Sequence, residues 1–578
     1  MLQFILGTSG TGKSTLVLNK MAQLATNREK CVLIVPEQFS STSELAVFKA
    51  LGDEKSAFVS VYSFRSFCGA IENKSGGGAR KTVTDANRVV LVRRGVNKLE
   101  GELKLYKKNS KSAHFCEMCA AAIKEFKIAG ATPGSLLAVN SKNAKTGEKL
   151  AELGQIYAAY EAVLGQTGLE ATDRILHCAK VAQESFFAGT HFFIDNFDGF
   201  TAPEYKLIER FISDGKNCTV TLCANSLFDE FNGLGLFSSV QKAANRLMQI
   251  AKKNDVGILK EENLSKNLRA KNEELCFVDD FIRNEEKLVP MLNGNVTVNV
   301  ANDIYAEVRT VSAQIHKLAL NGTRYNEIAV ICRDTKMYKS CITKYFKEFD
   351  IPFFCDENET AEFMPLAGFV RATIAVLRDG VTTKPILALL KTGLTSFDES
   401  TISELENYAF VWELKAADWQ NEFTKNPDGL TDKQTAEASE LLEKLENARK
   451  AIVPRLTAFN TQCKGKETGE IIKEIYFLIK DFNLEENTLN LIEKQKAEGD
   501  TFAADDTLKM WDTTIDLLDA LNDMLAGDEV LPQELDEFFV LLLRATEVGK
   551  SPRARQAVLF GQADRVRLDN VAHSFILG

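Results

Sequence analysis

The chain opens with Leu2-Gln3-Phe4-Ile5-Leu6-Gly7-Thr8-Ser9-Gly10-Thr11-Gly12-Lys13-Ser14, and this stretch decides the fold. Residues Gly7–Ser14 satisfy the phosphate-loop pattern G-x-x-x-x-G-K-[ST]. A short apolar run precedes the loop, and a helical pattern over Lys13–Leu24 follows it, which is the strand–loop–helix context that the motif requires. The sequence therefore predicts an α/β fold whose parallel core begins at residue 1.

The residue types of this loop suit a nucleotide triphosphate. Glycines let the backbone wrap phosphates with inward N–H groups, and the start of a helix adds partial positive charge. Lys13 would reach the β and γ phosphates, and Ser14 would place a hydroxyl on Mg²⁺, with Thr15 as the substitute. The alternative is a glycine-rich turn with an idle lysine. The predicted ATP-binding residues are Gly7, Thr8, Ser9, Gly10, Thr11, Gly12, Lys13, Ser14 and Thr15.

A second acidic group is expected at the end of a neighbouring strand. The run His191–Asp195 ends in a carboxylate that could hold Mg²⁺ through water, and the alternative is an exposed strand-end aspartate. Hydrolysing relatives usually have a glutamate next, but Asn196 follows here, and an amide cannot take a proton from water. A hydrolytic site of this kind should be slow or inactive unless Asp198 substitutes. The candidate catalytic residues are Asp195 and Asp198, and the candidate metal site is Ser14 with Asp195.

Composition narrows the class of protein. At about 150 residues per domain, 578 residues suggest roughly four domains, and 45% hydrophobic with 26% charged residues excludes a wholly disordered chain. No run of about 18 apolar residues predicts a membrane span, and the start has no basic leader. Twelve cysteines without framework spacing favour a reduced, cytoplasmic setting.

The α/β pattern occurs twice, and a long helical stretch interrupts it each time. In the first half the expected strands are Leu2–Leu6, Cys31–Val35, Phe58–Tyr62, His191–Asp195 and Cys218–Ala224. In the second half the pattern opens near Val296–Val300 and continues with the helix Ile304–Leu320, the strand Glu327–Cys332, the helix Lys336–Phe349 and the strands Pro352–Cys355, Ala557–Phe560 and Ser574–Leu577. Four domains follow: a first core (1–70 and 182–290), a helical insertion (71–181), a second core (291–375 and 550–578) and a second insertion (376–549). Because Gly578 follows a strand with no closing helix, we expect a fragment of a longer protein.

Charge is uneven along a chain whose net charge is −10. Arg80–Lys111 holds ten basic against three acidic residues, a balance of +7, and Lys550–Arg567 holds five against one. Asp500–Glu537 has twelve acidic residues opposed by Lys509 alone. Each run alone is more often a solvated helix face. The functional alternative is that the basic runs line a path for a phosphate backbone.

Other motifs give weaker predictions. His114, Cys116 and Cys119 could suggest a metal site, but without a second C-x-x-C the helical spacing favours helix core for Cys119. The loops after the second and third strands lie at the carboxyl edge of the sheet, where open α/β folds bind ligands. There Phe64, like Phe200 elsewhere, could stack on the bases of a single strand, although each aromatic alone is more often core.

Taken together, these residues resemble the AddB (RexB-like) subunit of bacterial ATP-dependent helicase–nucleases. The likeness spans the chain but covers only the N-terminal, helicase-like half of such a subunit. The segments that carry it are Gly7–Ser14, Val35–Gln38, Ser63-Phe64, Ile194–Phe197 with Phe200-Thr201, Asn326–Arg333, and Arg565–Arg567 with Val571–Gly578.

The resemblance implies a P-loop fold like that of superfamily 1 (UvrD-like) helicases, with two RecA-like cores that each carry a helical insertion. It implies a heterodimer with an AddA-type subunit that drives translocation, acting on double-strand DNA ends in recombinational repair. The AddB-type subunit would be a weak or inactive motor that tracks the single 5′ or Chi-containing strand. The DNA-binding positions it implies are Gln38, Ser40, Phe64, Arg65 and Phe200. The family's nuclease domain and iron–sulfur cysteines would lie beyond Gly578, so this chain should neither cut DNA nor hold a cluster.

Two alternatives remain beside this hypothesis. The chain could be an autonomous P-loop DNA helicase or ATPase that uses Asp195 and Asp198. It could also be an acidic scaffold whose phosphate loop no longer binds a nucleotide. DNA-stimulated ATP hydrolysis separates the first alternative from the hypothesis, and a nucleotide titration tests the second.

Overall fold

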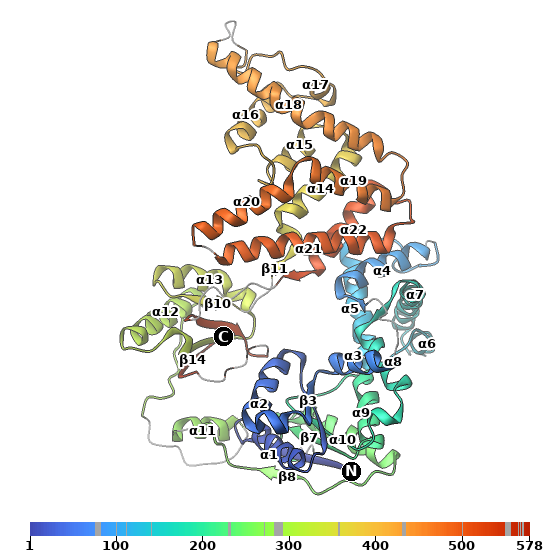
Figure 1. Ribbon diagram of the computed structural model, residues 1–578, viewed down its shortest axis with the longest axis vertical. Coiled ribbons are helices and arrows are strands. Elements are labelled where there is room, and N and C mark those ends of the chain that lie inside the picture. Colours follow the sequence, from blue (N-terminus) through green and yellow to red (C-terminus); the bar gives the residue numbers. More distant parts are fainter. Residues whose placement is uncertain are drawn as a thin grey trace. The chain divides into compact units, whose positions relative to one another are not determined.

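The computed structural model (Figure 1) describes most of the chain. The described residues are 1–75, 82–99, 101–110, 112–139, 142–228, 233–270, 272–282, 293–355, 359–430, 435–499, 501–548, 556–564, 566, 568 and 571–578. They divide into two compact units. The first comprises Met1–Thr84, Arg94–Ser110 and Met118–Val298, and the second comprises Asp85–Arg93, Lys111–Glu117 and Asn299–Gly578.

The first unit is built on a parallel sheet of six strands in the order β3-β2-β6-β7-β1-β8. Its strands are β1 (Leu2–Gly7), β2 (Lys30–Ile34), β3 (Val59–Tyr62), β6 (Thr190–Ile194), β7 (Asn217–Leu222) and β8 (Glu262–Leu264). Each of the five predicted strands is present, and the parallel α/β core that begins at residue 1 is confirmed. The three-residue edge strand β8 was not predicted, because it is too short to give an apolar pattern.

Helices cover both faces of this sheet. Helix α1 (Lys13–Thr26) buries Val17, Met21 and Ala25, which recur every four residues and therefore share one helix face. They pack with Ile5 of β1 in one core cluster. The opposite face of the sheet carries Phe4 in a second cluster, with apolar residues of α3 (Phe64–Ser75), α8 (Ala171–Val181), α9 (Ala202–Asp214) and α10 (Ser238–Lys253). Burial of each large apolar side chain contributes about 1.5–3 kcal/mol.

Between β3 and β6 the chain is mostly helical. The elements other than α3 and α8 are β4 (Thr82–Val83), α4 (Asp85–Lys98), α5 (Ala113–Ala129), α6 (Pro133–Leu137), α7 (Ala144–Thr167) and β5 (Leu169–Glu170). Cys116 and Cys119 lie on α5 with exposures of 0% and 2%, which confirms that Cys119 is helix core.

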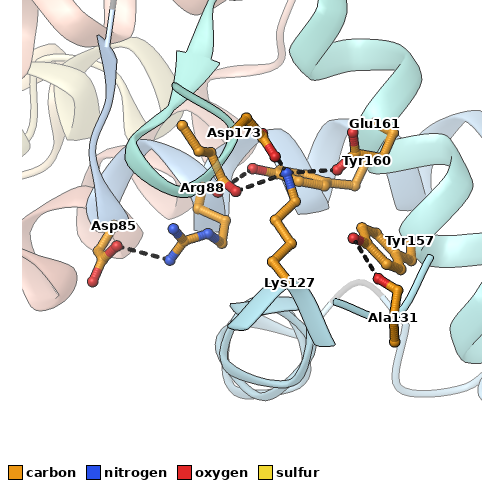
Figure 2. Close-up of polar contacts among 9 residues, drawn as sticks. Asp85, Arg88, Lys127, Ala131, Tyr157, Tyr160, Glu161 and Asp173 are labelled. Carbon is orange, nitrogen blue, oxygen red and sulfur yellow. Dashed lines mark hydrogen bonds and ion pairs between the residues drawn. The ribbon is translucent and has the colours of Figure 1, made fainter. Parts of the chain in front are cut away.

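A buried lysine ties four elements of this region together (Figure 2). Lys127 of α5 has a side-chain exposure of 4%, and its Nζ lies 2.7 Å from Glu161 of α7, 2.8 Å from Glu170 of β5 and 2.7 Å from Asp173 of α8. Burial alone would lower the pKa of Lys127, but the carboxylates of Glu170 and Asp173 outweigh it and hold that pKa above its usual value. The lysine therefore stays charged and joins segments that are distant in sequence.

The second unit contains a parallel sheet of four strands in the order β10-β13-β9-β14. The strands are β9 (Ile328–Cys332), β10 (Phe353–Cys355), β13 (Val558–Gln562) and β14 (His573–Leu577), all four as predicted. Helices α12 (Ile304–Leu320) and α13 (Thr335–Glu348) pack on it through Val308, Ile315 and Ile342. The second α/β segment does not open at Val296–Val300, because these residues form no strand and Val298 and Val300 are 90% and 97% exposed.

Helices dominate the rest of the second unit, as predicted. They are α14 (Pro365–Asp379), α15 (Thr383–Leu390), α16 (Glu399–Val411), α17 (Ala416–Gln420), α18 (Ala436–Gln462), α19 (Thr468–Asp481), α20 (Leu484–Ala497), α21 (Thr501–Leu525) and α22 (Pro532–Ala545), with a short antiparallel pair β11 (Glu359–Thr360) and β12 (Glu547–Val548). Across the described ranges, no helix has both the length and the apolar character needed to cross a membrane.

Candidate nucleotide and DNA site

The phosphate loop joins β1 directly to α1, in the strand–loop–helix context that the motif requires. Gly10 and Gly12 have φ angles of 80° and 90°, in the left-handed region where an L side chain is strained. Gly12 is the N-cap of α1, so the loop ends where the helix exposes its unpaired N–H groups. These two glycines give the loop a backbone that other residues would not readily adopt.

Lys13 lies against its own loop. Its Nζ donates to the carbonyl oxygens of Gly7 at 2.7 Å and Thr8 at 2.8 Å, and Thr11 Oγ1 also donates to the Thr8 carbonyl at 2.9 Å. Burial lowers the pKa of Lys13, although the nearby charge of Asp195 acts in the opposite direction. A half-buried ammonium that donates to carbonyl oxygens of its own loop is poised to exchange them for phosphate oxygens.

Asp195 faces the same site from β6. It follows the last residue of that strand, is only 4% exposed, and accepts hydrogen bonds from the Thr221 hydroxyl and, at 3.2 Å, from Asn196 Nδ2. An exposed strand-end aspartate is therefore wrong as an interpretation. The charges of Asp195 and of the exposed Asp198 both act on Lys13, so the structure brings these predicted residues together.

Asn196 has a structural reason to be an asparagine. Its φ is 65°, and asparagine is among the few residues with a side chain that enter the left-handed region readily. A glutamate here would meet backbone strain and would place a second carboxylate beside Asp195.

Residues 267–270, which no sequence motif predicts, also lie against the phosphate loop. Leu268 N donates to the Gly10 carbonyl at 2.8 Å, and a Cβ on Gly10 would lie 2.8 Å from the Cβ of Arg269. The positive charge of the exposed Arg269 also acts on Lys13. No periodicity or motif marks this segment, and it follows the unpredicted β8, so its place beside the loop cannot be predicted from the sequence.

A cavity of about 450 Å³ lies beside the start of the loop. Most of its lining residues are of polar types, and helix α11 (Glu273–Ile282) supplies one wall. Its lining residues are Gly7, Thr8, Asn225, Asn263, Leu264, Ser265, Lys266, Asn267, Cys276, Asp279 and Asp280.

Three of the predicted DNA-binding residues are accessible just after strands, in the turn that follows β2 and at the starts of helices α2 (Ser40–Ser56) and α3. Gln38 lies in the 3₁₀ turn Glu37–Phe39 that follows β2 and is exposed, and Ser40 beside it is half-buried. Arg65, after β3, is exposed and pairs with Glu37 at 3.5 Å. Because β2 and β3 are parallel neighbours, these residues share the carboxyl edge of the sheet.

Phe64 contradicts its predicted role in base stacking. It is 3% exposed and packs among aromatic rings of the core, with ring centroids 5.3 Å from Phe197, 6.4 Å from Phe211 and 6.2 Å from Phe200. Phe64 is therefore a core residue, which is the alternative given for it above. Phe200 is half-buried on the outer side of this cluster.

Replacing Phe64 with alanine is expected to cost about 3–5 kcal/mol of stability, because it empties a packed aromatic site. The neighbouring Arg65→Ala should change stability by less than about 0.5 kcal/mol, because Arg65 is exposed and its ion pair is at the surface. Chemical denaturation of both variants measures the difference. Equal, small losses would show that Phe64 is not a core residue.

The basic run Arg80–Lys111 is not one exposed path. Arg88 and Arg93 are buried at 6% and 5% exposure, Arg88 pairs with Asp85 at 2.8 Å, and Arg93 pairs with Glu537 at 3.0 Å. These two arginines therefore neutralise carboxylates of their own unit, which corrects their predicted role. Lys98, Lys104, Lys107 and Lys108 are exposed. The predicted basic residues that fall outside the described ranges are Arg80, Lys81, Lys111, Lys550, Arg553, Arg555, Arg565 and Arg567.

Comparison with known proteins agrees with this geometry. Residues 4–279 match the family described as "ADDB, N-terminal". Proteins named as the B subunit of an ATP-dependent helicase/deoxyribonuclease align with the whole chain. That of Thermoanaerobacter sp. (strain X514) is 26% identical over 592 residues and that of Clostridioides difficile (strain 630) 25% over 601, each covering 51% of the relative. That of Clostridium perfringens (strain 13 / Type A) is 27% identical over 603 residues, 52% of its length.

The chain thus spans about half the length of the curated relatives that it matches. The phosphate loop, β6 and residues 267–270 all lie inside the matched range 4–279, so the family match includes the whole candidate nucleotide site. Both the family match over residues 4–279 and the full-length alignments show that the chain is similar to AddB-type subunits.

Proposed function

We propose that this chain is the ATP- and DNA-binding, helicase-like part of the AddB-type subunit of an ATP-dependent helicase–nuclease that processes double-strand DNA ends for recombinational repair. The observation that carries the proposal is the phosphate loop, in which the charges of Asp195 and Asp198 act on Lys13. This loop lies in a chain that is similar to AddB-type subunits. The relatives are named as one subunit of an enzyme, which supports a partner subunit. That partner would be AddA-type, in a cytoplasmic heterodimer.

The sheets support an architecture like that of superfamily 1 helicases, with two RecA-like cores. In the first unit β2 pairs with β6, and most of the intervening chain is helical. In the second, β9 pairs with β13 and β14 across the long helical stretch α14–α22. Each sheet therefore contains strands from before and after a helical stretch. This topology supports a first core made of residues 1–70 and 182–290, and a second core made of residues 291–375 and 550–578.

ATP with Mg²⁺ suits the residues at the site. Ser14 is half-buried in the first turn of α1, where a hydroxyl can reach a metal held by phosphates. The Asp195 carboxylate already accepts two hydrogen bonds that fix its position, which suits an outer ligand acting through water. The ion would shield the phosphate charge, while Lys13 and the loop would hold the phosphates.

The DNA would run over the carboxyl edge of the first sheet, past Gln38, Ser40 and Arg65. An arginine on a phosphate contributes affinity that falls with salt, whereas polar side chains can read bases. The subunit would use this edge to track the single strand and to scan it for Chi. The nuclease activity and the iron–sulfur cluster would belong to the part of the relatives that this chain does not span.

Weak or absent motor activity follows from Asn196. The residue after Asp195 offers an amide in a left-handed backbone, so position 196 supplies no general base next to the metal-site carboxylate. The alternative, an autonomous helicase or ATPase, is favoured by one observation: the exposed Asp198 is close enough to act electrostatically on Lys13.

ATP turnover by the chain, with and without single-stranded DNA, tests the proposal. We expect Mg-ATP to bind and turnover to stay well below the roughly 10 s⁻¹ that is typical of enzymes. The Lys13→Ala variant is the control for any contaminating ATPase. Fast, DNA-stimulated turnover that Lys13→Ala abolishes would contradict the proposal and favour the autonomous motor. Absence of Mg-ATP binding would favour the scaffold alternative.

A further inference from the structure

A buried carboxylate holds the chain where it leaves the first unit. Glu274 of α11 is 3% exposed. Its two carboxylate oxygens accept hydrogen bonds from four backbone N–H groups, those of Asn293, Gly294 (3.1 Å), Asn295 (2.6 Å) and Val296 (3.2 Å). Gly294 has a φ of 77°, which allows successive N–H groups to converge on one anion. Burial opposes the charge of Glu274, but the bonds from Asn293, Asn295 and Gly294 prevail and lower its pKa.

The held segment occupies a particular place in the chain. The first unit ends at Val298, and the second resumes at Asn299, ahead of α12. Val298 and Val300 are almost fully exposed, so the connection has little packing of its own. The four N–H bonds to Glu274 are thus the described contacts that fix the first unit's end of this connection.

Helix α11 is also linked to the phosphate loop, through residues 267–270. Asn267 Nδ2 donates to Asp279 of α11 at 3.1 Å, and Asn267 Oδ1 accepts the N–H groups of Arg269 and Ala270. The next residue, Leu268, donates its N–H to the carbonyl of Gly10. Three consecutive sets of hydrogen bonds therefore run from the phosphate loop, through residues 267–270 and α11, to residues 293–296.

We propose that Glu274 is a positioning residue through which a nucleotide in the phosphate loop tightens the connection between the two units. Phosphates bound to the loop would fix Gly10 and the 267–270 turn, α11 would lose freedom with them, and Glu274 would hold the amides of residues 293–296 more persistently. Binding that orders one element lowers the cost of ordering the next one in contact with it. The inference rests on the proposed nucleotide binding but not on hydrolysis, DNA or a partner subunit.

Hydrogen exchange of the full chain, with and without Mg-ATPγS, tests the proposal. Coupling between sites typically changes an equilibrium by about 5- to 150-fold, and we expect the amides of residues 293–296 to exchange about tenfold more slowly with nucleotide bound. In Glu274→Gln the charge is lost, so these amides should exchange faster and respond to nucleotide by less than about twofold, while the affinity for Mg-ATPγS stays as in the wild type.

The neighbouring Glu273→Gln is the matched control, because Glu273 is exposed on the same helix, and it should behave as the wild type. A purely structural role would protect residues 293–296 equally with and without nucleotide. That result, with slowed exchange in Gly7–Ser14, would overturn the inference and leave the proposed function intact. A nucleotide response that persists in Glu274→Gln would also overturn it. No binding and no slowing in Gly7–Ser14 would overturn the proposed function together with the inference.

Discussion

Replacing Lys13 with alanine is expected to weaken Mg-ATP binding by about 10- to 150-fold, which corresponds to a charge-assisted hydrogen bond of about 1.5–3 kcal/mol. The half-buried Lys13 ammonium donates to the Gly7 and Thr8 carbonyls, and the loop around it offers phosphates the N–H groups at the start of α1. Without the ammonium, those carbonyls and the nearby Asp195 would face the triphosphate with uncompensated negative charge. Isothermal titration of the chain with Mg-ATP measures the change.

Lys20→Ala is the matched control for that experiment. Lys20 is also on α1, but its Nζ pairs with Glu262 at 2.6 Å rather than with the loop. It should bind Mg-ATP with unchanged affinity. If both variants lost affinity equally, the effect would reflect damage to α1, and a Lys13→Ala chain with full affinity would rule out the phosphate loop as the site.

Replacing Lys127 with methionine is expected to destabilise the first unit by about 3–5 kcal/mol, the usual cost of removing one partner of a buried ion pair. The change leaves three carboxylates, from Glu161, Glu170 and Asp173, without the cation that they share. Glu170 is completely buried, so its charge has the most to lose. Hydrogen exchange of α5 and α7 amides under native conditions measures the loss in the region concerned.

Two further variants make this result specific to charge. Lys124→Met changes an exposed lysine on the same helix and should cost less than about 0.5 kcal/mol. Adding Glu170→Gln to Lys127→Met should recover part of the loss, because it removes one uncompensated charge. A Lys127→Met chain as stable as the wild type would show that the cluster does not hold α5, α7 and β5 together.

Much of the fold was predictable from the sequence because central strands such as β6 and β9 are buried on both faces. The β6 run Thr190–Ile194 is wholly buried, so it appears as a short continuous apolar stretch bounded by turns. Edges and connections were harder. β8 has three half-exposed or exposed residues, and Val296–Val300 looked like a strand by composition although no strand of the described chain pairs with it.

The site was predictable in part. The residues of Gly7–Ser14 are contiguous and chemically distinctive, and Asp195 ends a recognisable strand. Arg269 reaches the loop only through tertiary packing, which no local pattern encodes. Phe64 and Arg88 have side chains of types that often bind DNA, but here they lie in the core and in an internal ion pair. Only the burial of an aromatic or basic residue separates these roles, and the sequence does not give that burial.

A structure of the chain with Mg-ATPγS would show directly whether the loop at Gly7–Ser14 binds a triphosphate. We expect the β and γ phosphates to accept hydrogen bonds from N–H groups of the loop, and Lys13 Nζ to leave the carbonyls of Gly7 and Thr8 for a phosphate oxygen. Ser14 and Asp195 should flank the ion. A nucleotide bound elsewhere, with Lys13 Nζ still donating to both carbonyls, would show that Gly7–Ser14 is not the nucleotide site.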